Sequence, residues 1–368
     1  MPDNVYDDGV AVAPKRRRFG SAIELSPHLV LTDNDLQQCL RIAFGGVLGF
    51  MLCKLMNWNY GTFFCVSPIL LLGLGPVLNA RIVWQFIAST LLPCVFILVV
   101  HGVLGDHPGA MLIVVIGMLA ALFTCMTRGT LFLFGAISIV MMQVMLNFAS
   151  YPSTDIGDLV ASNLMAGVTT LAIAMLMHTV FPDRAPRAFR PPMDKPLTNQ
   201  RHEVILATSV ATLSFLVFQS FDLKGSLSAQ VASILVLFPL NWHGAGNAAL
   251  KRAFGTLVGC NVGLLIQFVL LTHFDVLGFV ATGLWVSLMY FARHHMHEGG
   301  VSGAGFGAIT TLAILFGQYL SPTSDLVYSA LYRTSSVVFA VVCSLMAIYL
   351  MHQLLNRFAS TRLMIARP

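Results

Sequence analysis

Charged residues are scarce in this sequence. Lysine and arginine number 21 and aspartate and glutamate 16 among 368 residues, so that only 10% of the chain is charged. A soluble globular protein carries about 25% charged residues. Because 57% of the residues are apolar, too few polar side chains remain to cover a water-exposed surface. The composition therefore predicts a protein surrounded by the lipid bilayer, with room for twelve spans of about 20 residues each.

The sequence also lacks the patterns that hold disulfides, metals or leader peptides. Its seven cysteines lie in or beside apolar segments and form no Cys-x-x-Cys pair, so neither a disulfide framework nor a metal site is expected. Residues 1–34 are polar, which predicts no cleavable signal peptide. The basic residues stand in short clusters between apolar blocks, a distribution that does not indicate nucleic-acid binding. No cofactor is predicted.

Apolar runs alternate with short polar or Gly/Pro-containing breaks. Because a backbone in hydrocarbon must satisfy its own hydrogen bonds, each run is predicted to be a helix. Thr32-Asp33-Asn34-Asp35 is predicted to cap the first one. The predicted spans are residues 36–56, 61–78, 82–104, 109–126, 129–149, 157–181, 202–221, 226–240, 248–272, 274–292, 300–320 and 325–353.

The basic residues predict the orientation of these spans. Seventeen of them fall on the side of both termini, and only Lys54 and Lys224 fall in loops on the opposite side. Short cytoplasmic loops carry an excess of lysine and arginine. We therefore expect a multi-pass protein of the plasma membrane with both termini in the cytoplasm.

The two halves of the chain resemble each other. Asn57-Trp58-Asn59-Tyr60-Gly61 ends the first span as Phe221-Asp222-Leu223-Lys224-Gly225 ends the seventh, an offset of 225 − 61 = 164, and Gly135 matches Gly305 at an offset of 170. Six spans are an even number, so the halves share one orientation. The sequence thus predicts an all-α polytopic membrane protein of about 12 transmembrane helices in two parallel six-helix repeats. Its predicted parts are a basic tail (1–35), the first repeat (36–181), a Pro/Arg-rich linker (182–201), the second repeat (202–356) and a basic tail (357–368).

Parallel repeats favour transport, because two similar halves form an interface at which a solute can be held and exposed alternately. Short or proline-interrupted spans in matching positions indicate such a site. Ser67-Pro68 lies in the second span, and Ser233 and Pro239 lie in the eighth. A proline frees a carbonyl one turn back, so these residues are candidates for the solute path. An ordinary kink that only shapes packing is the alternative.

Cations within or beside the spans are further candidates for the path. Arg333 lies eight residues after Asp325, about 12 Å along the twelfth helix. A guanidinium at that depth needs water, an acid or an anionic solute. A side chain that reaches outward to the lipid headgroups is the alternative. The position that matches it in the first half is Asn163, which is also polar. Arg41 lies near a predicted membrane surface, and we expect its side chain to reach the headgroups.

Three basic residues are expected at the cytoplasmic mouth, namely Arg81, Lys251 and Arg252. They could gather an anionic solute there. Anchoring of the loops to the cytoplasmic face is the alternative.

Histidines give a weaker signal. Arg293-His294-His295-Met296-His297-Glu298 clusters three of them, but a metal-dependent oxygenase needs several such clusters, so no enzyme is expected. We expect a wet cytoplasmic loop here, with His294 and His297 as candidates for proton-linked gating. His178 and His352 end the sixth and twelfth spans in parallel positions and are candidates for a proton relay.

One stretch carries a family resemblance. Ala249-Leu250-Lys251-Arg252-Ala253-Phe254-Gly255-Thr256-Leu257-Val258-Gly259 resembles a motif of the fusaric acid resistance and aromatic acid exporter proteins, in a short membrane-only branch. The first half departs from it, with Arg81-Ile82-Val83-Trp84-Gln85 at the matching place. The resemblance implies export of small aromatic or amphipathic acids across a bacterial inner membrane, coupled to protons and assisted by a HlyD-type periplasmic adaptor.

Two other functions stay open at this point. One is a passive anion channel, which the lack of acidic residues in mid-span favours. The other is a membrane subunit that anchors a larger efflux complex. A small-molecule substrate is expected for the exporter and for the channel. A homo-oligomer is compatible with the exporter, the channel and the anchor subunit.

Overall fold

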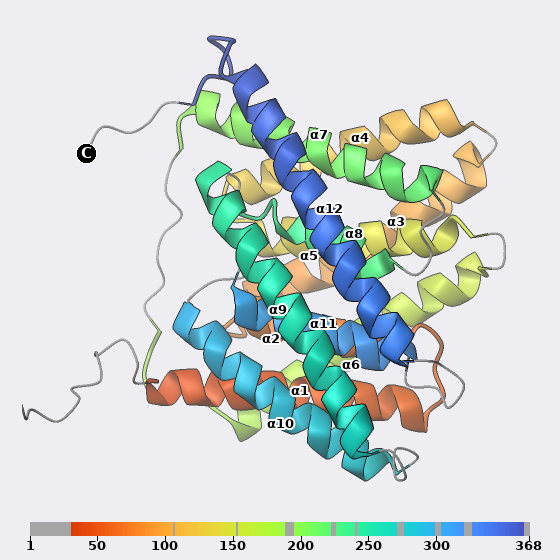
Figure 1. Cartoon of the computed structure of the whole chain (residues 1–368), viewed down its shortest axis with the longest axis vertical. Coiled ribbons are helices and arrows are strands. Elements are labelled where there is room, and N and C mark those ends of the chain that lie inside the picture. The colour runs from red at the N-terminus through yellow and green to blue at the C-terminus, as the bar shows by residue number, and fades with distance from the viewer. Residues whose placement is uncertain are drawn as a thin grey trace, which may run out of the picture. The chain divides into compact units, whose positions relative to one another are not determined.

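The computed structural model describes residues 31–105, 107–151, 154–187, 195–221, 226–239, 242–270, 276–298, 303–319 and 326–363. Every regular element in these ranges is a helix, and none is a strand (Figure 1). The helices are α1 (Asp33–Leu55), α2 (Gly61–Leu74), α3 (Ala80–Leu104), α4 (Pro108–Thr127), α5 (Phe132–Ala149), α6 (Ile156–Val180), α7 (Leu197–Ser220), α8 (Leu227–Leu235), α9 (Trp242–Val269), α10 (Leu277–Glu298), α11 (Ala304–Tyr319) and α12 (Leu326–Leu355).

Each predicted span coincides with one of these helices, which confirms the all-α, polytopic fold. Eight of the helices in the described residues are long and apolar enough to cross a membrane by themselves. The shortest ones are α2 with 14 residues, α8 with 9 and α11 with 16. At 1.5 Å per residue, nine residues reach about 14 Å, roughly half the thickness of the hydrocarbon layer.

The N-terminus of α1 has the predicted cap. Thr32 is the N-cap residue, and its hydroxyl accepts from the backbone N–H of Asp35. The carboxylate of Asp35 accepts in return from the backbone N–H of Thr32 at 3.1 Å. This reciprocal pair satisfies two donors at a helix end that has no backbone partners of its own.

The contacts between helices repeat from one half to the other. Helix α3 packs against α5 and α6 just as α9 packs against α11 and α12, and α2 packs against α6 as α8 packs against α12. Contacts between the halves follow the same rule, because α1 packs on α10 as α7 packs on α4, and α2 packs on α11 as α8 packs on α5 (Figure 1). Every substantial helix pair has its equivalent six helices later. This is the arrangement expected of two parallel six-helix repeats.

Glycines give the same result at the level of single residues. A Cβ on Gly135 of α5 would meet the carbonyl of Leu122 and the side chain of Met126 on α4. A Cβ on the equivalent Gly305 of α11 would meet the backbone of Phe291 and His295 on α10. Small residues let helices approach closely in membranes, and the matched glycines Gly135 and Gly305 do so at equivalent places in the two halves.

Pro68 lies inside α2 without ending it. A proline cannot donate to the carbonyl of the residue four positions earlier, which here is Phe64. That carbonyl faces Gly49 of α1 so closely that any side chain at Gly49 would collide with it. The proline therefore serves the close packing of α1 on α2.

One sequence prediction about α1 is wrong. Arg41 does not extend towards headgroups, because its side chain is 1% exposed and donates to the carboxylate of Asp183 at 2.6 Å. Asp183 belongs to the segment that follows α6. Two further contacts fix this segment: the backbone N–H of Arg184 donates to the Oδ1 of Asn34, and Arg187 donates to the Oε1 of Gln38. A contact across 142 residues cannot be seen in local hydropathy.

Candidate functional site

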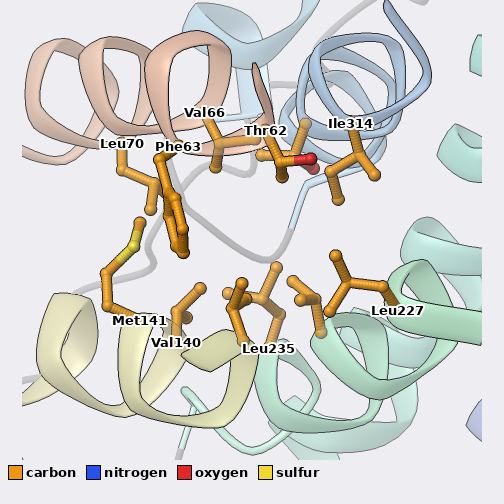
Figure 2. Close-up of a pocket in the computed structure, with 12 residues that line it drawn as sticks. Thr62, Phe63, Val66, Leu70, Val140, Met141, Leu227, Leu235 and Ile314 are labelled. Atoms are coloured by element: carbon orange, nitrogen blue, oxygen red, sulfur yellow. The ribbon is translucent and has the colours of Figure 1, made fainter. Parts of the chain in front are cut away.

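Four helices meet where the two halves join. Helices α2 and α11 supply one side of a narrow cavity, and α5 and α8 supply the other (Figure 2). The figure shows Phe63 and Leu70 of α2 facing Met141 of α5, and Ile314 of α11 facing Leu227 of α8. The lining residues are Thr62, Phe63, Val66, Leu70, Val140, Met141, Val144, Leu227, Val231, Leu235, Thr310 and Ile314. Transporter sites form at such an interface between repeats.

The cavity is closed by apolar side chains. Its volume is about 10 Å³, close to the minimum that one water molecule needs. Only two of its lining residues, Thr62 and Thr310, carry a polar side chain, and both are buried. At this cavity the four helices pack too closely to admit a solute.

Beside the cavity, α5 and α8 are joined by three buried amides. The Nδ2 of Asn147 donates to the Oε1 of Gln230 at 2.8 Å, and the Nε2 of Gln230 donates to the Oε1 of Gln143 at 3.2 Å. The Nε2 of Gln143 is buried and has no partner in the described structure. A buried donor without a partner costs about 1–3 kcal/mol. The amide chain thus holds one donor that a solute or water can satisfy when the interface opens.

The equivalent contact between α2 and α11 is built differently. Gly317 matches Asn147 at the offset of 170, since 317 − 147 = 170. A Cβ on Gly317 would lie 2.9 Å from the backbone nitrogen of Thr62, and a Cβ on Gly61 would lie 2.5 Å from the carbonyl oxygen of Gly317. The two halves therefore meet through bare backbone on one side of the cavity and through amide side chains on the other.

The Lys251–Gly259 motif lies on α9, against α11. Gly255 leaves no room for a side chain next to the carbonyl of Ala304, and a Cβ on Gly259 would lie 3.0 Å from that of Ala308. The hydroxyl of Thr311 donates to that of Thr256 at 3.3 Å. The glycines and the threonine of the motif thus hold α9 tightly against one of the helices that line the cavity.

This packing buries Arg252. The side chain is 3% exposed, and its Nη1 donates to the hydroxyl of Thr310 at 2.7 Å. Its Nε has no partner, and no carboxylate in the described part of the chain pairs with it. Since Thr310 lines the central cavity, an uncompensated cation lies one hydroxyl away from the interface of the two halves. Burying a lone charge is costly, so this position favours a role that needs a cation.

The neighbouring Lys251 has a partner of its own. Its Nζ lies 3.5 Å from the carboxylate of Glu298 at the end of α10, and Glu298 also accepts from the backbone N–H of Gly305. Both Lys251 and the third predicted mouth residue, Arg81, are exposed. Of the three predicted cations, Arg252 is the one that the described structure hydrogen-bonds to a residue lining the cavity.

The other predicted path residues are spread over several contacts. Asn163 is buried and donates to the backbone carbonyl of Thr90 on α3 at 3.2 Å. Ser67 and Pro68 are buried in α2 but do not line the cavity. Ser233 and Ser214 share a hydrogen bond of 2.7 Å between α8 and α7.

The last two predicted path residues are Pro239 and Arg333. Pro239 is half-buried after the end of α8. Arg333 belongs to α12, but its side chain lies outside the described residues, so its role stays a prediction.

The predicted relay histidines do not line the cavity. His178 bonds to the carbonyl of Ala174 on its own helix at 2.9 Å. His352 of α12 lies 3.0 Å from the Nε2 of His202 on α7. His294 is exposed and His297 half-buried at the end of α10.

The expectation of a wet loop at the histidine cluster is wrong, because α10 continues through it to Glu298. His295 is 4% exposed and its ring lies 5.1 Å from that of Phe306 on α11. Among the described residues, no three histidine, cysteine or acidic side chains group as metal ligands would.

Comparison with known families agrees with this architecture. Residues 38–177 match a family described as a protein of unknown function, DUF2955, and residues 211–347 match the fusaric acid resistance protein-like family. No curated protein and no solved structure matches the chain. The second half of the chain is thus similar to the fusaric acid resistance-like family.

The match confirms the resemblance inferred from the Lys251–Gly259 motif, which falls within the matched residues. In general terms, this similarity indicates a membrane transporter. The two halves match different families although their helix contacts repeat. The amide chain on α5 and α8 facing a glycine contact on α2 and α11 shows how far the repeats have diverged.

Thr310 and Asp183 are the residues that sequence reasoning missed. A threonine in an apolar span is common and does not by itself indicate a site. Thr310 becomes a candidate only because Arg252 donates a hydrogen bond to it. Asp183 was counted with the linker. A signal did exist, because Arg41 is a cation within a span and required an acid somewhere in the chain.

Proposed function

We propose that this protein transports a small organic anion through the interface between its two halves. One observation carries the proposal: Arg252 is buried, lacks a carboxylate partner in the described structure, and donates to Thr310, whose side chain lines the closed central cavity. An anion that reached the opened cavity would supply the missing charge. A carboxylate or similar oxyanion suits the free N–H groups of the guanidinium.

The closed cavity supports alternating access. Apolar side chains from four helices seal the interface, and a rocking motion of one repeat against the other would part them. On parting, the buried donors of Arg252 and Gln143 would meet water or solute in place of protein. The gain of those hydrogen bonds would offset part of the cost of separating the apolar surfaces.

We further propose export from the cytoplasm across a bacterial inner membrane, with both termini in the cytoplasm. The family resemblance supports this direction, a substrate that is aromatic or amphipathic, and a HlyD-type periplasmic adaptor. The charge distribution of the loops supports the orientation. Proton coupling would involve histidines outside the cavity, since none of its lining residues titrates near neutral pH.

The lack of a titratable side chain among the lining residues of the cavity also supports a second candidate, a passive anion channel. A coupled transporter needs titratable groups that sense the solute, and no Asp, Glu or His lines the cavity. The channel and the transporter share the Arg252 site. They differ in whether a pH gradient drives uphill movement.

Flux of a small aromatic acid into liposomes tests the proposal. Arg252→Met keeps an unbranched side chain in place of the arginine stem and removes the charge, so transport should be lost. The thermal stability should stay unchanged or rise, because removal of an unpaired buried charge is often neutral or stabilising. Arg128→Met, at an exposed residue just after the end of α4, is the matched control and should transport normally.

The outcomes separate the candidates. Uphill flux under an imposed pH gradient supports the transporter, and unitary currents without uphill flux support the channel. Normal flux in Arg252→Met rejects the anion site for both. Loss of flux together with loss of stability would assign Arg252 a structural role only.

A further inference from the structure

A groove runs between α7 and α12 on the second half. Its volume is about 580 Å³, within the range of small-molecule sites. Buried residues of α8 form its floor, namely Ser226, Ala229 and Ser233. Its rims are exposed apolar side chains, including Leu213 of α7 and Phe339 of α12. Such exposed apolar residues on membrane helices face lipid, so the groove opens towards the bilayer.

The residues that the structure describes in the lining of this groove include no charged side chain. Its walls include four aromatic side chains, those of Phe218, Phe221, Tyr332 and Phe339. Its hydroxyl groups are largely engaged with one another, since Ser226 donates to Tyr332 at 2.8 Å and Ser214 shares a bond with Ser233. Hydroxyls can accept one more hydrogen bond while they donate. This chemistry suits an uncharged ring with one polar group and does not suit an ion.

The first half does not keep this groove. At the offsets of the repeat, Ser214 corresponds to Phe50 (214 − 164) and Ala347 to Met177 (347 − 170). Phe50 and Met177 are both buried. Helices α1 and α6 pack directly, because a Cβ on Gly45 would lie 3.4 Å from Ile173. The space is thus specific to the second repeat and arises from smaller, hydroxyl-bearing side chains.

Helix α8 separates the groove from the central cavity. Ser226, Ala229 and Ser233 face the groove, whereas Leu227, Val231 and Leu235 line the cavity. The helix has only nine residues. A solute in the groove therefore lies one short helix away from the interface between the halves.

We propose that the groove between α7 and α12 binds an uncharged aromatic solute taken directly from the bilayer. A weak aromatic acid fits both sites, because its neutral form partitions into hydrocarbon and its anion is the partner that Arg252 lacks. Delivery from the groove to the cavity rests on the proposed transport function. Binding in the groove does not.

Cys343 provides a native probe, since it is exposed and lines the groove. The full chain in phosphatidylcholine nanodiscs is treated with N-ethylmaleimide, and alkylation of Cys343 is followed by peptide mass spectrometry. With 1-naphthol at ten times its Kd, alkylation should slow about tenfold, because about one site in ten stays free. Naphthalene-1-sulfonate, the same ring with a fixed charge, should give no protection.

A filled groove is the decisive variant. Ser214→Phe combined with Ala347→Met installs the first-half residues and should abolish protection by 1-naphthol. Leu350→Phe, on an exposed part of α12 outside the groove, is the control and should keep it. Protection that survives the double substitution overturns the proposal. A second result would also overturn it: alkylation of Cys343 that is slow in nanodiscs, fast in detergent and unchanged by 1-naphthol. That result would show that a lipid acyl chain occupies the groove.

The two proposals can fail separately. Arg252→Met should lose anion flux and keep 1-naphthol protection of Cys343. The filled groove should lose protection, and its flux of weak aromatic acids should fall while the chain stays folded. Protection in the parent chain with normal flux in the filled variant would overturn delivery from the groove.

Discussion

The guanidinium of Arg41 donates to the carboxylate of Asp183 at 2.6 Å, joining the start of α1 to the segment that follows α6. Asp183 also accepts from the Nε of Arg187 at 3.2 Å. Burial alone would raise the pKa of Asp183, but the two guanidinium groups outweigh it and hold the pKa below its ordinary value of 3.8. The ion pair closes the first repeat at the end that carries the linker.

Asp183→Asn should destabilise the protein, because it leaves the guanidinium of Arg41 buried without a counter-charge. Loss of one partner of a buried pair costs about 3–5 kcal/mol, and the lower end applies because Asp183 is 20% exposed. Thermal unfolding in detergent micelles measures the effect. Asp33→Asn, which removes an exposed partner of Arg184, is the control and should change little.

The same pair predicts a pH dependence. Because the pKa of Asp183 is lowered on folding, its stabilising contribution is present above the ordinary value of 3.8 and is lost as the pH falls through the lower folded value. The parent chain should therefore lose stability below about pH 4 more steeply than Asp183→Asn. Parallel acid profiles of the two chains would contradict the assignment.

Gly317→Ala should loosen the contact between α2 and α11. The added Cβ would meet the backbone of Gly61 and Thr62 at 2.9–3.0 Å, where no side chain can move aside. Overpacking of this kind costs about 1–3 kcal/mol. Gly117→Ala in α4, where a Cβ meets nothing within 4 Å, should instead be neutral or slightly stabilising. Equal unfolding temperatures for the two variants would argue against a tight seam.

Val231→Ser should weaken the apolar seal of the central cavity. It replaces a lining methyl group with a hydroxyl and gives water both space and a partner. We expect passive anion leak in liposomes without an imposed gradient, and a loss of about 1–3 kcal/mol in stability. Val168→Ser changes an exposed valine of α6 and should not leak. If Val231→Ser shows no passive anion leak, the lining of this cavity is not what prevents anion passage.

Arg333→Ala should abolish or strongly reduce transport and leave the yield in the membrane intact. The residue stands within α12, and its equivalent in the first half, Asn163, bonds to α3. Arg357→Ala, at an exposed residue just after the end of α12, is the control. Unchanged flux in Arg333→Ala would reject its place in the solute path.

The positions of the helices could be predicted from sequence, because hydropathy and backbone hydrogen bonding act over single spans. The cap at Thr32 and the match of Gly135 with Gly305 could be predicted in the same way, because both depend on short stretches of sequence. Hydropathy predicts that this span ends at residue 292, six residues before α10 ends at Glu298, because His294 and His297 are polar. The burial of His295 against Phe306 of α11 explains why the helix continues.

The site could be predicted less well, since it depends on contacts between distant segments. Lys251 and Arg252 are adjacent basic residues, yet one is exposed and paired with Glu298 and the other is buried beside Thr310. Helical periodicity separates their faces by about 100° but does not say which face meets α11. Only the packing of Gly255 on Ala304 decides that.

Because Arg252 is charged, a displacement of α9 would respond to the transmembrane voltage, whereas a displacement of its apolar neighbours would not. Its positive charge has no carboxylate beside it in the described residues, so any movement that carries it through part of the hydrocarbon does work against the transmembrane voltage. A unit charge that crosses the full field changes the free energy by about 2.3 kcal/mol per 100 mV. If opening of the interface moves Arg252 along the membrane normal, the balance between closed and open interfaces would shift with the transmembrane voltage, in proportion to the fraction of the field that this side chain crosses.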